Sequence, residues 1–419
     1  MAWDKLRDIN EKAVEIAKGV SLLKPISWPP PAEEEFLSAW RKKKKGLPKI
    51  DYPKIDYTDT IAALQSLKDS FSASHPMEIY TKKTLESYIR AAEMVQAVNT
   101  PKLQKLSEEI FGKPGSLMPG CQQTSVEAAE KLVALAVRFQ HPFVTEPDLC
   151  VSAEQIKVFL DGHTVPRMGA HAPEVQIVTE LAAKATAGGR LIKLRAGTCF
   201  TRYDFDQLYV HEVMTHALTG INGSFQPILK TMGRGAPRTT LTQEGLATFA
   251  EVITGAIDLG RLKRLALRII AIDRALNGAN FVETFEYFLL NGQSEKESFW
   301  SAARIFRGGQ PDGKSVFTKD GVYLDGLIKV HSLFQWALMH NRMGVLHLLF
   351  CGRVSLEDLF LLEGSLTDGL VAEPHFFPDW YEKIEGLAGS LTFSLLTNVI
   401  NADDLDGYFS ALTRGLSAP

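Results

Sequence analysis

The chain has 419 residues, of which 45% are hydrophobic and 23% are charged, and this composition is ordinary for a globular protein. Its formal net charge of −3 provides no overall positive field, so we expect no nucleic-acid partner. No apolar run approaches the ~20 residues that cross a bilayer, and residues 1–5 lack the apolar core of a secretion signal. We therefore expect a cytoplasmic protein without a membrane span.

The cysteines are widely spaced and form no CxxC pair. The sequence therefore predicts neither a disulfide framework nor a thiolate zinc site. The four are Cys121, Cys150, Cys199 and Cys351. The most basic run, at residues 41–45, is interpreted as a solvated helix end or loop, with docking to an acidic partner as the alternative.

Helical periodicity dominates the first part of the chain. Proline and glycine at residues 112–115 interrupt it and form the best candidate for a boundary between lobes. We predict a helical N-terminal lobe over residues 1–115 and a second domain over residues 116–419. Helices in the first lobe are expected at 2–24, 33–45, 57–73, 77–98 and 101–112.

The second part contains one clear strand pattern. Residues 190–195 alternate apolar and basic side chains and are flanked by glycines, which is typical of a short, half-buried strand. If an edge of this strand is free, it could pair with an extended peptide. The expected fold class is therefore α+β, mainly helical with a small sheet. Further helices are expected at 125–139, 174–186, 202–218, 241–254, 260–275, 279–291, 296–307 and 321–341.

The predicted helix at 202–218 contains a His-Glu-x-x-x-His motif formed by His211, Glu212 and His216. In the usual zinc-protease motif the histidines are four residues apart, and the glutamate after the first is the catalytic base. A spacing of five separates the side chains by about 140° on a regular α-helix, which is too far for one ion. A π-bulge would realign them, so we predict such a distortion between His211 and His216.

A third metal ligand is predicted 28 residues after His216, at Glu244. Glu244 lies in the first turn of a helix and faces apolar residues, and a carboxylate in such a place is costly unless it is paired or bound to metal. Two histidines and one carboxylate form the open site of a catalytic zinc enzyme, so we expect one Zn²⁺ per chain. Thr248 and Glu251, further along the helix, could support the ligands.

The segments HEVMTH at 211–216 and QEGLA at 243–247 resemble the QEGLA-motif family, as do residues 317–327 and 356–359. That family includes bacterial proteins labelled flavohemoglobin expression-modulating, and the eukaryotic microtubule-associated tyrosine carboxypeptidases, which remove the C-terminal tyrosine of α-tubulin. The resemblance implies a zincin-like metallopeptidase core within 116–419, zinc ligands at His211, His216 and Glu244, and a catalytic Glu212. Met214 stands where the tubulin-acting members have glycine, so the resemblance implies a tyrosine carboxypeptidase-like enzyme but leaves the preference for a terminal tyrosine open.

A carboxypeptidase also needs a cation that holds the terminal carboxylate of its substrate. Arg234 and Arg238 lie between the ligand segments, and Arg307 and Lys319 lie in segments like those of the family. Each is a candidate for this contact and is otherwise a surface charge. Tyr323 is either a core tyrosine or a donor to the oxyanion of a tetrahedral intermediate.

These patterns predict a zinc metallopeptidase, and our first hypothesis is a carboxypeptidase that acts on peptide or protein C-termini. Glu212 would take a proton from the attacking water and pass it to the leaving amine. One alternative is another zinc hydrolase, such as an endopeptidase or an amidase. The other is a non-catalytic regulatory or binding protein that keeps its metal for structure. The sequence does not indicate the oligomeric state.

Overall fold

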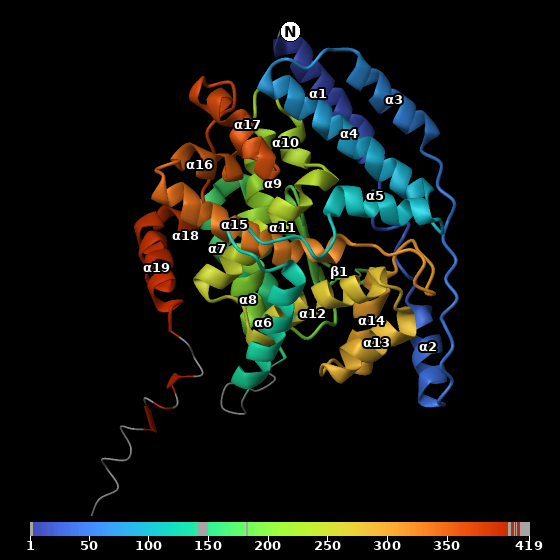
Figure 1. The fold of residues 1–419 in the computed structure, drawn as a ribbon. Helices are drawn as coiled ribbons and strands as arrows, with labels where there is room; N and C mark the ends of the chain where they lie inside the picture. Colours follow the sequence, from blue (N-terminus) through green and yellow to red (C-terminus); the bar gives the residue numbers. More distant parts are fainter. Residues whose placement is uncertain are drawn as a thin grey trace, which may run out of the picture.

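Three helical elements cross the centre of the computed structural model, which describes residues 3–140, 150–181, 183–400, 404, 405, 407, 409 and 410 (Figure 1). They are the π-helix η2 (Tyr209–Ala217) and the α-helices α11 (Thr240–Thr254) and α15 (Val322–Met339). Helix α11 contacts both of the others. Helix α11, which carries the QEGLA segment, therefore lies against both the HEVMTH segment in η2 and the family-like residues at the start of α15.

Helices α11 and α15 approach so closely that only glycine fits between them. A Cβ atom on Gly245 would lie 2.4 Å from the carbonyl carbon of Gly326, and one on Gly326 would lie 2.4 Å from the carbonyl oxygen of Leu241. These separations leave no room for a methyl group. The close contact fixes the position of α11, and with it Glu244, which directly precedes Gly245.

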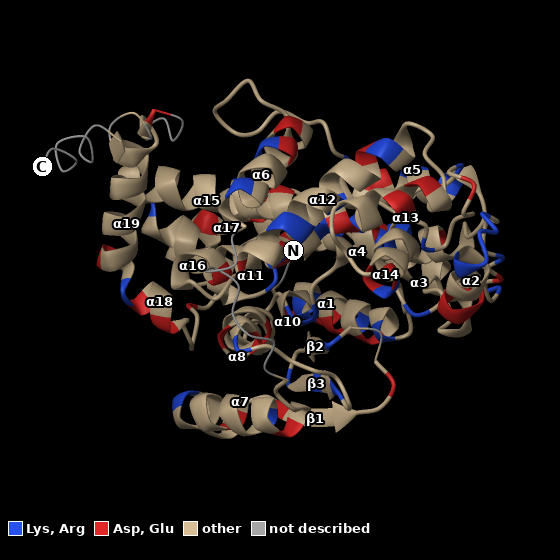
Figure 2. Ribbon diagram, turned by 90° about the horizontal axis from the view of Figure 1, so that it is seen from below, with Lys and Arg blue, Asp and Glu red and all other residues tan. Residues whose placement is uncertain are grey.

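A three-stranded sheet forms a layer with helix α7 (Ala153–Met168) on one side of the molecule (Figure 2). Strand β1 (Glu174–Val178) pairs in parallel with β3 (Leu191–Arg195), and β2 (Ala185–Gly188) pairs antiparallel with it. The predicted strand at 190–195 is confirmed, and the predicted helix over 174–186 is wrong. Pairing with β3, which is separate in sequence, overrides the local alanine-rich helical pattern.

Strand β3 lies in the middle of this sheet, because the strand order is β1-β3-β2. Both of its edges are therefore already paired. The condition for pairing with an extended peptide, a free edge on this strand, is therefore not met.

The N-terminal helices pack on the segments that flank the central elements, since α1 contacts α10 (Thr231–Arg234) and α4 contacts η3 (Pro237–Thr239) (Figure 1). Leu6, Met77 and Tyr80 belong to the same hydrophobic core as residues of η2 and α11, and Asn10 accepts a 2.6 Å hydrogen bond from the Thr231 hydroxyl. The parts on either side of residue 115 thus share one core. The predicted start of the first helix at residue 2 lies outside the described residues. The helices of this part are α1 (Trp3–Lys18), α2 (Pro31–Arg41), α3 (Thr58–Asp69), α4 (Pro76–Gln96) and α5 (Pro101–Phe111).

The C-terminal helices α16 to α19 were not predicted from the sequence. Helix α16 is buried on nearly every side, so its residues are apolar without a marked period. These helices cover the end of the molecule opposite α2 (Figure 1). The remaining elements are α6 (Ser125–Phe139), α8 (Tyr203–Leu208), α9 (Leu218–Ser224), α10 (Thr231–Arg234), α12 (Leu259–Leu276), α13 (Phe281–Leu290), α14 (Glu295–Ile305), α16 (Met343–Cys351), α17 (Leu356–Thr367), α18 (Asp379–Glu382), α19 (Ile384–Thr397), η1 (Gly169–His171), η3 (Pro237–Thr239) and η4 (Lys319–Gly321).

A disulfide joins Cys150 to Cys199, so the prediction that the cysteines would stay unpaired is wrong for these two. The adjacent residues Val151 and Phe200 form an antiparallel bridge, which brings the cysteines together across 49 residues of chain. Spacing in the sequence could not reveal this contact, because it depends on how the chain folds back. Among the described residues, no helix is long and apolar enough to cross a membrane.

Candidate metal centre

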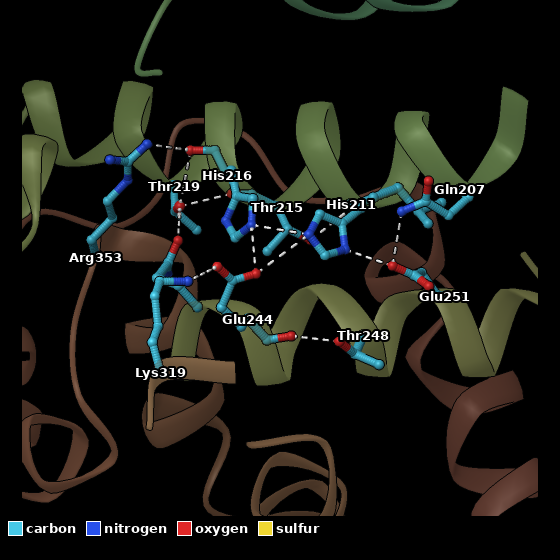
Figure 3. Close-up of polar contacts among 12 residues, drawn as sticks. Gln207, His211, Thr215, His216, Thr219, Glu244, Thr248, Glu251, Lys319 and Arg353 are labelled. Carbon is cyan, nitrogen blue, oxygen red and sulfur yellow. Dashed lines mark hydrogen bonds and ion pairs between the residues drawn. The ribbon is translucent and has the colours of Figure 1, made fainter. Parts of the chain in front are cut away.

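The two histidines of the motif converge because the helix that carries them is π-helical. Residues Tyr209–Ala217 form η2, and the Thr215 hydroxyl donates to the Val210 carbonyl five residues earlier. The wider turn brings residues five apart onto one face, so the Nε2 atoms of His211 and His216 lie 3.2 Å apart (Figure 3). The predicted π-type distortion is confirmed.

Glu244 completes the triad from near the N-terminal end of α11. Its Oε2 atom lies 3.5 Å from the Nε2 atom of His211 and 3.5 Å from that of His216. The point equidistant from these three atoms lies about 2.0 Å from each, which is close to the zinc–nitrogen and zinc–oxygen distances in proteins. The three side chains therefore fit a zinc-sized ion. Among the described residues, they are the group of histidine, cysteine and acidic side chains whose ligand atoms lie close enough together to hold a metal ion.

Glu251 holds the ring of His211 from the side away from the triad. Its Oε1 atom lies 2.6 Å from His211 Nδ1 and accepts a 3.0 Å hydrogen bond from Gln207 Nε2 (Figure 3). It also accepts a 2.6 Å hydrogen bond from Arg261 Nη2. The side chain of Glu251 is completely buried. Burial alone raises its pKa, but His211 and Arg261 reverse this and bring the pKa to about 2. A carboxylate at this place accepts a hydrogen bond from Nδ1–H, and in that tautomer Nε2 carries the lone pair that a metal could bind.

Glu244 is also anionic. Burial raises its pKa, but Lys319 and the two histidines hold the pKa well below its usual range. The pKa of His211 is lowered by burial and raised more strongly by Glu244 and Glu251, to about 10. Glu244 and Glu251 thus flank the two histidines as carboxylates, and each is also paired with a cation, Lys319 and Arg261 respectively.

Glu212 follows His211 in η2 and is half-buried. Within the described part of the chain, its carboxylate has no hydrogen-bond or ion-pair partner. A carboxylate next to a metal ligand and without a partner of its own is available to accept a proton. Met214, by contrast, is fully packed into the main hydrophobic core.

The four cations proposed to contact substrate lie in different surroundings. Arg238 donates to both oxygens of buried Asp358, at 2.8 Å each, and Arg234 donates to the Ala17 carbonyl at the end of α1. Both side chains thus join helices, and neither contacts the triad. Lys319, in contrast, donates to Glu244 Oε1 at 3.3 Å.

Arg307 and Tyr323 lie in a cationic cluster next to the triad. The Tyr323 ring has the Lys319 ammonium 5.3 Å from its centre and the Arg268 guanidinium 5.6 Å from it. Burial and the neighbouring Arg304 lower the pKa values of Arg268 and Arg307 to about 10 each. Arg261 and Arg268 could not be predicted from the sequence, because α12 reaches the site only through tertiary packing. Glu251, a secondary candidate in the sequence, does contact a ligand, and Thr248 donates to the Glu244 backbone carbonyl.

The fold and the site together define a mainly helical α+β protein with a candidate divalent-metal site formed by two histidines and a glutamate. Residues 34–399 match the family model described as microtubule-associated tyrosine carboxypeptidase. The chain therefore belongs to the microtubule-associated tyrosine carboxypeptidase family.

Curated relatives agree with this family. Microtubule-associated tyrosine carboxypeptidase 1 of Mus musculus is 31% identical over 212 residues, which cover 49% of this chain and 42% of the relative. The proteins of the same name from Rattus norvegicus and Homo sapiens are 32% and 31% identical, and each match covers 42% of this chain and 37% of the relative. The chain thus matches less than half the length of these relatives.

Proposed function

We propose that this protein is a zinc-dependent carboxypeptidase that removes residues from the C-terminus of a peptide or protein, and that it acts in the cytoplasm. One observation carries the proposal. The ligand atoms of His211, His216 and Glu244 lie 3.2 to 3.5 Å apart, and the next residue after the first ligand is the unpaired carboxylate of Glu212. The family name of its relatives supports the choice of a carboxypeptidase.

The residues of the site divide the chemical work between them. Zinc, when held by the triad, supplies a Lewis acid that makes water more acidic and polarises a carbonyl group. Glu212 accepts the proton of the attacking water and delivers it to the leaving amine, while Glu251 keeps His211 in one tautomer. Tyr323 is proposed as a donor to the oxyanion, from its place beside Lys319.

We propose that Arg268 and Arg307 hold the terminal carboxylate of the substrate. Arg304 occupies both oxygens of Asp320, while Arg268 reaches that carboxylate only at 3.8 Å. Neither Arg268 nor Arg307 has a hydrogen bond to an acidic group among the described residues. Half-buried cations without a close acidic partner are costly, and an incoming carboxylate would offset that cost.

Matched peptides with a free or an amidated C-terminus test the proposal. We expect the wild type to cleave the free acid and to lose most activity on the amide, because the amide cannot pair with the arginines. Glu212→Gln should keep bound zinc and lose about 10²- to 10⁴-fold in turnover. Arg268→Gln should raise KM for the peptide with a free C-terminus. The ratio of kcat/KM between the free-acid and the amidated peptide should therefore become smaller.

Each rival gives a different result. Equal cleavage of acid and amide by the wild type would favour an endopeptidase or an amidase. Equal cleavage by the wild type and Glu212→Gln would refute the mechanism. Zinc binding without cleavage of any member of a C-terminal peptide library would favour a regulatory or binding protein.

A further inference from the structure

The two oxygens of Glu244 have different partners. Oε2 points to the two histidines, at 3.5 Å from each Nε2 atom. Oε1 points away from them and accepts a 3.3 Å hydrogen bond from the ammonium of Lys319 (Figure 3). One oxygen of the carboxylate is thus directed at the candidate metal position, and the other is already occupied.

Lys319 is held firmly in this position. Only 9% of the residue is exposed, and it begins the short helix η4. The preceding residue, Thr318, donates its amide to the Ser107 hydroxyl at 2.8 Å, and the following residue, Asp320, is paired with Arg304. The ammonium also faces the Tyr323 ring at 5.3 Å. Contacts on both sides therefore fix the lysine backbone, and the ring limits where its ammonium can go.

A carboxylate can bind a metal ion through one oxygen or through both. Binding through both would occupy an additional coordination position, whereas a catalytic zinc site keeps a position open for water. A donor on the second oxygen makes binding through one oxygen more favourable, because the metal and the lysine then each have an oxygen of their own.

We propose that Lys319 is a positioning residue that keeps Glu244 a one-oxygen ligand and so keeps the fourth coordination position open. The inference rests on the proposed zinc site. It gives Lys319 a role that the sequence did not suggest, since its candidate role there was to contact the substrate. It also gives a reason for a nearly buried lysine beside the site.

The test replaces Lys319 and measures coordination directly. The full chain is loaded with Co²⁺, whose visible absorption distinguishes four from five ligands, and zinc affinity is measured separately by competition with a chelator. We expect Lys319→Met to shift the cobalt spectrum from four toward five ligands and to weaken zinc binding about 10- to 100-fold. Lys319→Arg keeps a cationic donor and should restore both signals.

Lys329→Met is a matched control, because Lys329 donates to Asp325 and not to the triad, and it should leave both signals unchanged. If Lys319→Met does not fold, Lys319→Gln tests the same point. The glutamine side chain is one bond shorter than lysine and neutral, so its amide falls short of the position from which the ammonium donates to Glu244. A folded Met or Gln variant with an unchanged cobalt spectrum would overturn the role of Lys319. A wild-type protein that binds neither ion would instead overturn the proposed zinc site.

Discussion

At the scale of single residues, the candidate site depends on the three side chains of the triad and equally on the neighbouring side chains that orient them. Glu251 has three hydrogen-bond partners on one oxygen, and one of them is His211. Arg261 bonds its other oxygen as well. Because these contacts fix the carboxylate in a fully buried place, the imidazole it touches has one orientation only.

Replacing Glu251 by Gln should therefore weaken metal binding without removing a ligand. The amide has the same shape, but it is neutral and can turn its NH₂ group toward His211, which would disfavour the tautomer with a free Nε2. We expect zinc affinity to fall about 10- to 100-fold in a chelator competition. Glu363→Gln, which alters an ion pair with Arg342 far from the triad in sequence, serves as the control. Equal affinities of the two variants would show that Glu251 does not support the ligand.

At the scale of elements, the crossing of α11 and α15 sets the position of Glu244. Gly245→Ala would place a methyl group 2.4 Å from the Gly326 carbonyl carbon, and backbone cannot move aside as a flexible side chain can. We expect a loss of about 1–3 kcal/mol in the free energy of unfolding, measured by urea denaturation, together with weaker zinc binding.

Gly364→Ala provides the comparison for this change. Gly364 lies in helix α17, and a Cβ atom there would meet nothing within 4 Å. Alanine favours helix over glycine, so this variant should be as stable as the wild type or more so. A Gly245→Ala protein with wild-type stability would mean that the two helices can separate at little cost.

The elements also show why some features could be predicted from the sequence and others could not. The π-helix followed from two histidines at a spacing that no regular α-helix accommodates, and Glu244 followed from a carboxylate among apolar residues. Strands β1 and β2 could not be predicted in the same way, because pairing with β3 decides their conformation. The contact of Arg238 with Asp358 and the bond of Cys150 to Cys199 join residues far apart in the chain, so no local pattern marks them.

At the scale of the whole molecule, buried contacts join the N-terminal helices to the segments that carry the candidate metal ligands. The Tyr88 hydroxyl donates to the Gly235 carbonyl at 2.6 Å, and Arg234 donates to the Ala17 carbonyl at 2.7 Å. Both contacts lie in the region between the metal ligands, and both partners come from the part before residue 115. The N-terminal helices therefore support the loop that leads from His216 to Glu244.

A fragment of residues 116–419 should for this reason fail to form the site. It would expose the apolar surface that Leu6, Met77 and Tyr80 cover, and it would leave Thr231 and the Gly235 carbonyl without their partners. We expect the fragment to show no cooperative thermal transition by circular dichroism and no stoichiometric zinc, while the full chain melts in one transition.

Tyr88→Phe in the full chain removes a single buried hydrogen bond. It should lower the free energy of unfolding by only about 1–3 kcal/mol, because the Gly235 carbonyl is left unpaired. A fragment that melts cooperatively and binds one equivalent of zinc would show instead that residues 116–419 are an independent domain, and that the contacts across residue 115 only join two lobes that fold separately.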